Sequence, residues 1–259
     1  MATIEKQYTG ELHKEFGYFA AWDPGIKYKL GDYGKIKHKT VFERYGNISD
    51  LGIKFRTTDP SPSGKLSYQS KGTTKSIIKI GGAIDDPALS TGKVTAEIDF
   101  NFENEKSTIL EAIGVREYGI SSIDDLRKEL EILRAKKEWD DEYAVIVSIK
   151  IADSETVLVT NQGGASIRLK TDIDMKALPS DPTTLNIADA SLNWEITNEN
   201  NCSYKYLAKG ELTPLFKLGK FERKRPFTKR RLVYRKGIGA RKSNVNKHKI
   251  VFKEVEVIP

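Results

Sequence analysis

The chain has 259 residues, 38% of them hydrophobic, and a formal net charge of +7. That length suffices for one large or two small domains with a sizeable core. One cysteine excludes a disulfide framework and a cysteine-rich metal site, and agrees with a reducing compartment. No run approaches the roughly 18 apolar residues of a spanning helix, and MATIEKQYTGELHK lacks a signal-peptide core, so we expect a soluble cytoplasmic protein.

The charge is distributed unevenly. Residues 217–249 contain fourteen Lys and Arg and one acid, whereas residues 1–216 carry a net negative charge. A basic segment interleaved with aromatic rings is typical of binding to nucleic acid or to anionic lipid, and a solvated extension is the alternative. The candidate contact residues are Arg223, Lys224, Arg225, Lys229, Arg230, Arg231, Arg235, Lys236, Arg241 and Lys242.

The first residues predict a short amphipathic helix. Apolar residues recur every four positions over 2–16, and Gly17 is typical of a helix end. GYFAAWDPG follows as an aromatic cluster closed by a Pro-Gly turn. We expect Phe19 and Trp22 to anchor the helix to a sheet, since large aromatic side chains are usually buried.

Two hairpins are predicted after the loop TTDPSPSG. In the first, KLSYQS and KSIIKIGG flank the turn KGTT. In the second, VTAEIDFNF (94–102) alternates apolar and polar residues without a break, which places the apolar groups on one face of a strand. ENEK then supplies a polar turn, and TILEAIGV (108–115) is expected to return as its partner strand.

The clearest helix signal is SSIDDLRKELEILRAKKEW. Ser122 is placed as the N-cap, with acids in the first turn and lysines at the other end, as the helix dipole favours. Ile123, Leu126, Leu130 and Leu133 form an apolar stripe. We expect Trp139 to cover the end of that stripe against the sheet.

The strand pattern then resumes. We expect strands at 143–151 and 156–160 around a turn at 153–155, and a third strand at 165–170 after the turn Asn161–Gly164. A longer connection leads to ADASLNWEIT, a turn at 198–201, CSYKYLAKG and GELTPLFKLGKF.

These elements define an α+β fold. It is a mostly antiparallel twisted β-sheet with an N-terminal helix, one inserted amphipathic helix and a basic C-terminal extension. We assign residues 1–216 to one domain and 217–259 to the extension, which is partly β.

The sequence carries no recognisable catalytic chemistry. Its three histidines stand apart in polar contexts, and no HExxH, CxxC, GxSxG or phosphate-loop motif occurs. Adjacent carboxylates lie at turns or helix starts, where acids serve capping and solubility. We therefore expect no enzyme, no catalytic residues, no cofactor and no metal.

The alternating hairpin permits two interpretations. It can be a half-buried hairpin of a soluble fold, or a segment of membrane β-barrel wall with one face toward lipid and one toward water. A strand of about nine to eleven residues spans a bilayer, and 94–102 has that length. The candidate membrane-inserting residues are Val94, Ala96, Ile98, Phe100, Phe102, Leu110 and Ala112.

The order of these parts resembles that of the bacterial gasdermins. The resemblance lies in the helix ending LHKEFGYF, the strand VTAEIDFNFENE, the run DDEYAVIVSIKIADSETVLV before a Gly-Gly turn, and YLAKGELTPLFKLGKF. It implies a bacterial defence protein, released by proteolysis, whose amphipathic strands join into an oligomeric membrane pore. Two features depart from that family: the only cysteine is Cys202, and a long basic segment stands in place of a short inhibitory peptide.

The first functional hypothesis is accordingly a gasdermin-like pore former that moves from the cytoplasm to the inner membrane. Its partners would be copies of itself, anionic lipid and an activating protease. The alternative is a non-enzymatic protein that binds nucleic acid through the basic extension, and a self-assembling structural protein is a third possibility.

Overall fold

The computed structural model describes residues 3–81, 93–174, 176, 185–189, 191–223 and 250–255. The candidate contact residues from Lys224 to Lys242 lie outside these ranges, and the division of the chain at residue 216 stays a prediction. The elements are α1 (Ile4–Phe16), β1 (Phe19–Ala20), β2 (Asp32–Lys37), β3 (Val41–Asn47), η1 (Ile48–Leu51), β4 (Gly64–Gln69), β5 (Thr73–Gly81), β6 (Lys93–Phe102), β7 (Ser107–Gly119), α2 (Ile123–Ala135), β8 (Tyr143–Thr160), β9 (Ala165–Asp174), β10 (Glu195–Asn200), β11 (Tyr204–Arg223) and β12 (Ile250–Glu254).

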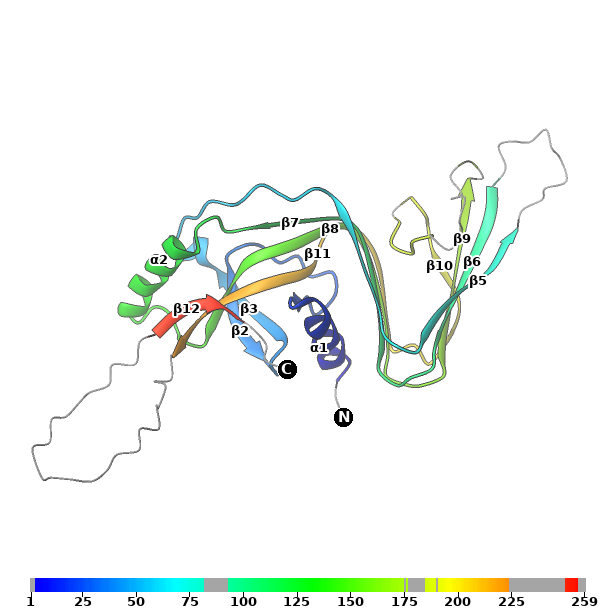
Figure 1. The fold of residues 1–259 in the computed structure, drawn as a ribbon, viewed down its shortest axis with the longest axis horizontal. Helices are drawn as coiled ribbons and strands as arrows, with labels where there is room; N and C mark the ends of the chain where they lie inside the picture. Colours follow the sequence, from blue (N-terminus) through cyan, green and yellow to red (C-terminus); the bar gives the residue numbers. More distant parts are fainter. Residues whose placement is uncertain are drawn as a thin grey trace, which may run out of the picture.

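The described strands form two antiparallel sheets joined by a sharp bend (Figure 1). The larger one, here the body sheet, is built around β8, with β11 on one edge and β7 and β2 on the other. β4 extends it beyond β7, and β12 and β1 pair with β11. The second, here the small sheet, has the order β10-β9-β6-β5. The predicted α+β class with a mostly antiparallel twisted sheet is confirmed.

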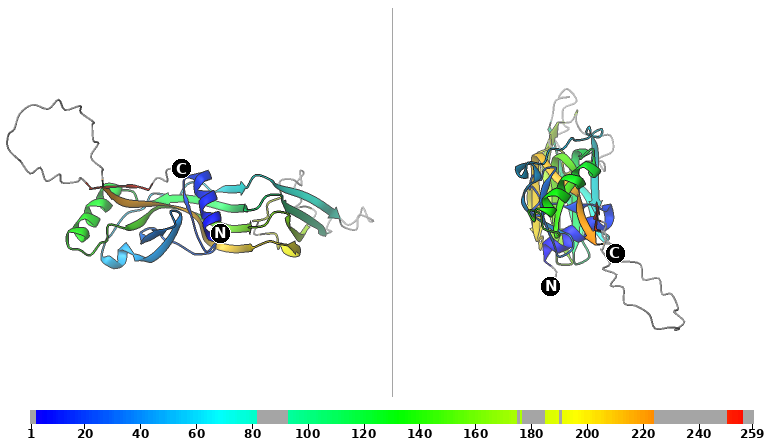
Figure 2. Two further views of the ribbon diagram at one scale, coloured as in Figure 1. Left: turned by 90° about the horizontal axis from the view of Figure 1, so that it is seen from below. Right: turned by 90° about the vertical axis from the view of Figure 1, so that its left-hand side faces the viewer.

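The two sheets share one lateral order. Across the body sheet the strands run β4, β7, β8, β11, and across the small sheet their chain neighbours run β5, β6, β9, β10. The connections between them, residues 70–72, 103–106, 161–164 and 201–203, are here called the bend. Seen from below, the strands of the two sheets follow one another along the long axis of the molecule (Figure 2, left).

The connections of the bend are bonded to one another in that same lateral order. Glu103 N donates to Gly72 O at 2.9 Å, and Gly164 N donates to Phe102 O at 2.8 Å. On the other side, Ser203 Oγ lies 2.6 Å from Asn161 Oδ1. The bend is therefore a laterally hydrogen-bonded continuation of the sheet.

Each connection contains one residue in the left-handed region, which turns the chain sharply. These residues are Gly72 (φ 75°), Lys106 (φ 62°), Gly164 (φ 72°) and Asn201 (φ 56°). Glycine adopts this conformation freely, asparagine with modest strain, and lysine only at a cost of about 1–2 kcal/mol.

Both predicted hairpins are wrong in their pairing. β4 pairs with β7 and β5 with β6, so KLSYQS and KSIIKIGG lie in different sheets. Likewise β6 pairs with β5 and β9, whereas β7 pairs with β4 and β8. The physical reason is that KGTT and ENEK pass the chain through the bend instead of reversing it within one sheet.

β8 also differs from expectation, because it runs unbroken through the predicted turn at 153–155. It is 18 residues long, and Ser154 and Glu155 are buried within it. β10 begins only at Glu195, so the predicted strand ADASLNWEIT is shorter than expected, and the predicted turn at 198–201 begins later.

The helices lie where the sequence placed them. α1 ends at Gly17, which adopts φ 69°. Trp22 and Phe19 contact α1, with ring centroids 5.7 Å from Tyr8 and 4.8 Å from His13. α2 begins after Ser122, whose Oγ accepts a hydrogen bond from Asp125 N at 3.2 Å.

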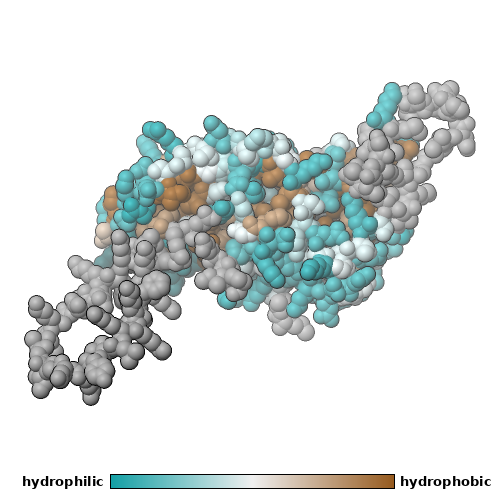
Figure 3. All heavy atoms as spheres, in the orientation of Figure 1, coloured by the Kyte–Doolittle hydropathy of each residue, from teal (hydrophilic) through white to brown (hydrophobic). Residues whose placement is uncertain are grey.

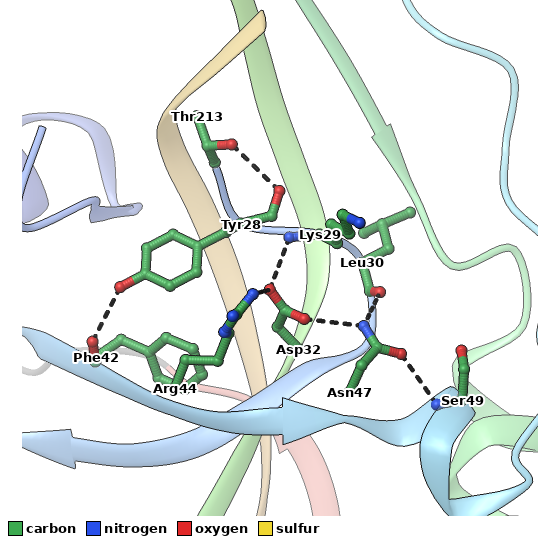
Figure 4. A network of polar contacts seen from close by, with 9 residues as sticks. All are labelled: Tyr28, Lys29, Leu30, Asp32, Phe42, Arg44, Asn47, Ser49 and Thr213. Carbon is green, nitrogen blue, oxygen red and sulfur yellow. Dashed lines mark hydrogen bonds and ion pairs between the residues drawn. The ribbon is translucent and has the colours of Figure 1, made fainter. Parts of the chain in front are cut away.

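The core of the body sheet lies mainly under α2 and the β2–β3 hairpin. Trp139 is buried there together with Leu126, Leu130 and Leu133 of the predicted stripe, whereas Ile123 at the start of α2 is exposed. A polar network fixes the hairpin: the buried Asp32 carboxylate accepts from Lys29 N and Asn47 Nδ2, both at 2.9 Å (Figure 4). Arg44 Nη1 lies 3.4 Å from the same carboxylate, which supplies the countercharge a buried carboxylate needs.

Candidate functional site

The apolar face of the small sheet gathers five of the seven candidate insertion residues. Alternation along β6 places them in one buried cluster with β9, and each is at most 3% exposed: Val94, Ala96, Ile98, Phe100 and Phe102. The intervening residues of β6 carry the polar face, where Asp99 accepts from Arg168 Nε at 2.7 Å. The sheet is therefore amphipathic, with its apolar face covered in this state.

The other two candidates lie elsewhere. Leu110 is on β7 in the body sheet and packs in a cluster with Tyr8 and Leu12 of α1. Ala112, two residues further along β7, lies in a separate small cluster with Val115 and Ala152. These two residues therefore face the body of the protein and not the small sheet, because β6 and β7 do not form a hairpin.

A segment preceding β10 covers the apolar face of the small sheet. This segment, here the strap, comprises residues 185–189 and 191–194. Its Leu185, Ile187 and Leu192 belong to the same buried cluster as Phe100. In Figure 1 the strap lies on the side of the small sheet that faces the body sheet.

Polar contacts attach the strap backbone to both sheets. From the body sheet, Glu111 Oε2 accepts from Ile187 N at 2.9 Å, and Thr156 Oγ1 donates to Ile187 O at 3.0 Å. Ser154 Oγ, two residues before Thr156 on the same face of β8, donates to Ala188 O. The strap therefore joins the two sheets, because its backbone is bonded to the body sheet at Ile187 and Ala188 while its apolar side chains pack on the small sheet.

Lys75 completes this arrangement from the small sheet. Its Nζ donates to Leu185 O at 2.6 Å and lies 3.6 Å from Glu111 Oε1. The side chains of Lys75 and Glu111 are only 20% and 10% exposed. A charge pair this shielded depends on both partners, because removing one leaves the other poorly solvated.

The strap is less closely packed on its outer side. A cavity of about 300 Å³ separates it from β11, with Leu207 and Lys209 among its lining residues. The buried indole Nε1 of Trp194 finds no hydrogen-bond partner among the described residues. This side offers room for the strap to move.

Below α1, the body sheet buries an acid near the bend. Glu155 is 1% exposed, and burial raises its pKa to about 8. The pKa of Tyr8 on α1 is also raised, first by burial and then by the nearby Glu155. Gln7 Nε2 donates to Thr160 O at 3.1 Å, which ties α1 to the last residue of β8 before the bend.

β12 covers part of the outer edge of β11. It pairs with that strand from Gly219↔Glu254 to Arg223↔Ile250. Phe252 is buried, and its ring lies 5.1 Å from the ring of Phe221. Arg223 is thus the one candidate contact residue whose backbone the structure describes.

On the face drawn in Figure 3, the hydrophobic residues of the described part lie in patches between hydrophilic ones. Among the described residues no group of His, Cys, Asp or Glu is arranged to hold a metal ion. Within those same ranges, neither helix is long and apolar enough to cross a membrane.

The sequence did not indicate the strap, its polar contacts or the bend. The alternation of Leu192 and Trp194 with polar residues predicted a strand at this place, and it gave no sign that the segment covers another sheet. Glu111 and Lys75 look like ordinary polar positions in alternating strands. Their signal lies in the pairing of the strands, which the alternation alone does not determine.

The fold thus defines an α+β protein in which two antiparallel sheets share one strand order across a bend. It is similar to the cryo-EM structure of the gasdermin A3 membrane pore, at 13% identity and TM-score 0.32, covering 85% of this chain and 90% of that one. It is also similar to a bacterial gasdermin from Bradyrhizobium tropiciagri, at 15% identity and TM-score 0.33, covering 83% and 86%. No protein-family model and no curated protein sequence matches the chain.

Proposed function

We propose that this protein is the resting form of a non-enzymatic, gasdermin-like pore former. The observation that carries the proposal is the lateral order shared by the two sheets. Straightening the bend would join β4 to β5, β7 to β6, β8 to β9 and β11 to β10 without exchanging any neighbours. The product is one long four-stranded sheet made of two antiparallel hairpins.

The register of the two central segments, β6–β7 and β8–β9, supports this conversion. Phe102 pairs with Ala165 on the small-sheet side of the bend, and Ser107 pairs with Thr160 on the body side. Both pairs belong to one antiparallel register, with four residues in each intervening connection. The connections 103–106 and 161–164 can therefore extend the same ladder when the bend opens.

Strand lengths fit a bilayer. β5, β6 and β9 contain 9, 10 and 10 residues, and about nine to eleven tilted residues span a membrane. β10 has only 6 residues, but Leu192, Trp194 and Ile196 alternate along the strap and into it. Once released, the strap can extend β10 toward a full span, which would also uncover the apolar face.

Insertion then follows from the two faces of the small sheet. The apolar face of β6 and β9 would meet lipid, and the polar face would line water. A closed ring of copies is required, because an open sheet edge leaves backbone groups unpaired in hydrocarbon. We assign the first contact with an anionic inner membrane to the basic segment from Arg223 onward, at about 1 kcal/mol per cation near the surface.

Release would involve the C-terminal strand. β12 occupies the edge of β11, so cleavage within residues 224–249 by an activating protease would free that edge. A cytoplasmic precursor of this kind suits a role in defence, where a triggered pore stops the host cell.

The test is dye release from vesicles of phosphatidylglycerol and phosphatidylethanolamine, using the full chain and the chain trimmed by limited proteolysis. Ser154→Cys with Ala188→Cys, in a Cys202→Ser background, would tie the strap to β8. We expect no release while this disulfide is oxidised and recovery after reduction. Ser154→Cys alone is the matched control.

Equal release from the oxidised and reduced protein would contradict a role for the strap. If neither form of the wild type releases dye, but the protein shifts DNA or RNA in a salt-sensitive way, the nucleic-acid alternative replaces the pore.

A further inference from the structure

The cavity of about 300 Å³ behind the strap is bounded by the strap itself, β8 and β11. Apolar side chains from the strap and from β11 form one part of its wall, among them Ile187, Leu192 and Leu207. Polar groups from all three elements form the rest. A concave space with apolar side chains and a few polar groups is typical of a small-molecule site, and this volume lies at the small end of the usual range of about 300–1,000 Å³.

Several polar groups of the wall are engaged within the protein. Ser154 Oγ and Thr156 Oγ1 donate their hydrogens to two consecutive carbonyl oxygens of the strap. Asp189, the acid on the wall, accepts through Oδ1 from Ser191 N at 2.9 Å and from Ser191 Oγ at 2.7 Å. These contacts keep the strap closed, so an occupant has to be held mainly by the remaining groups.

The remaining groups are hydrogen-bond donors. The indole Nε1 of Trp194 is buried and finds no hydrogen-bond partner among the described residues, although a buried indole N–H normally has an acceptor. Lys209 Nζ donates to Asn193 Oδ1 at 2.9 Å, and an ammonium group has two further hydrogens to give. Lys209 is exposed, so its charge lies where the cavity meets solvent. This set of donors suits an anionic ligand with acceptor oxygens.

We propose that the cavity binds a small organic carboxylate with a compact apolar body, such as a short branched-chain or aromatic acid. The apolar body occupies the space between the strap and β11. The carboxylate supplies the acceptors that Lys209 Nζ and the Trp194 N–H can use. Hydrogen bonds of an ammonium group to a carboxylate are roughly twice as strong as neutral ones, so the charge of the ligand contributes to its recognition.

Ligand binding is linked to strap opening, because the strap is one wall of the cavity. A ligand that binds the closed form and not the open one lowers the open fraction by a factor of 1 + [L]/Kd. An acid at ten times its Kd therefore reduces strap opening about 11-fold. Since opening uncovers the apolar face of the small sheet, the acid would inhibit pore formation. The inhibition rests on the proposed function, whereas the binding does not.

Hydrogen exchange at the Ile187 amide of the full chain tests the binding without a membrane. The probes are benzoate, phenylacetate and 3-methylbutanoate, each titrated at constant ionic strength. At least one of them should slow exchange at Ile187 in a saturable way, by about 11-fold at ten times its Kd. Benzyl alcohol has the ring of benzoate without the charge, and it should bind at least about tenfold more weakly.

Two substitutions remove the groups assigned to the carboxylate. Lys209→Met keeps an unbranched side chain without the charge, and Trp194→Phe keeps an aromatic ring without the N–H. Each should raise the Kd of the same acid by at least about tenfold, because a hydrogen bond to a charged group is lost. Lys65→Met is the matched control, since Lys65 is an exposed lysine on β4 that does not line the cavity.

Exchange without acid is measured for every variant, so a change in the strap itself is separated from a change in binding. Absence of saturable protection with all three acids would assign the cavity to water and overturn the site. Equal affinity in Lys209→Met and Lys65→Met would overturn the recognition of a carboxylate by Lys209. Equal affinity for benzoate and benzyl alcohol would do the same.

Dye release separates this inference from the proposed function. Under conditions in which the wild type releases dye, the effective acid should slow release from the wild type and not from Lys209→Met. Release that ignores the acid, despite protection at Ile187, would overturn the inhibition and leave the pore in place. Protection at Ile187 in a protein that releases no dye on any vesicle would contradict the proposed function and leave the binding site in place.

Discussion

Glu111→Gln isolates the polar contacts that hold the strap closed. The substitution keeps the size of the side chain but removes the charge that faces Ile187 N at 2.9 Å and Lys75 Nζ at 3.6 Å. A hydrogen bond to a charged group contributes roughly 1.5–3 kcal/mol and a neutral one about 0.5–1.5 kcal/mol. With Lys75 left less well paired, we expect the closed strap to lose about 1–2 kcal/mol relative to the open one.

That loss corresponds to an increase of about 5- to 30-fold in strap opening. Hydrogen exchange at the Ile187 amide measures it directly, because this amide donates to the altered side chain. Dye release should accelerate by a similar factor if strap opening limits it. Glu105→Gln, an exposed substitution in the bend, is the matched control. Unchanged exchange at Ile187, with the fold intact, would refute the assigned role of Glu111.

Three further substitutions give separate tests. Burial raises the pKa of Glu155 to about 8, so the folded state keeps a proton that the unfolded chain releases near pH 4.5. The contribution of Glu155 to the free energy of unfolding is therefore largest below pH 4.5 and is lost as the pH rises to about 8. Glu155→Gln should remove this loss, on the order of a few kcal/mol, and urea unfolding curves that change in parallel for both proteins from pH 5 to 8.5 would argue against it. Phe252→Ala should cost about 3 kcal/mol of packing between β12 and β11 and expose the edge of β11. We then expect faster proteolysis near residue 250 and dye release without trimming. Unchanged protection of β12 from proteolysis would count against its role in covering that edge. Lys106→Gly removes the backbone strain of a lysine at φ 62° and should stabilise the bent state by about 1 kcal/mol. We therefore expect slower dye release, and faster release would contradict the bend as the moving part.

The sequence predicted the elements whose signals are local. The Ser122 cap and the end of α1 at Gly17 depend on neighbouring residues, and the structure confirms them. Three of the four stripe residues of α2 are buried as well, and Ile123 is exposed. The apolar face of β6 follows in the same way from alternation over nine residues.

Partners of the strands could not be predicted from the same signals. Alternation identifies a face but not its neighbour, so ENEK looked like a hairpin turn although it lies in the bend. Asp153–Glu155 looked like a turn because it is polar, yet Ser154 and Glu155 are buried under the strap and α1, where tertiary packing overrides local preference. Whether Leu110 and Ala112 reach lipid also depends on that packing.

The shared strand order has a kinetic consequence. In the proposed opening, every strand of the small sheet keeps the neighbours it has, so the hydrogen bonds between the strands need not be broken and re-formed. The activation barrier then arises from a limited set of events: departure of the strap, rotation of the four left-handed residues, and loss of α1 or β12 contacts. A transition of this kind conserves most of the native enthalpy on the way, so its rate should respond steeply to substitutions in the bend and weakly to those within β6 or β9.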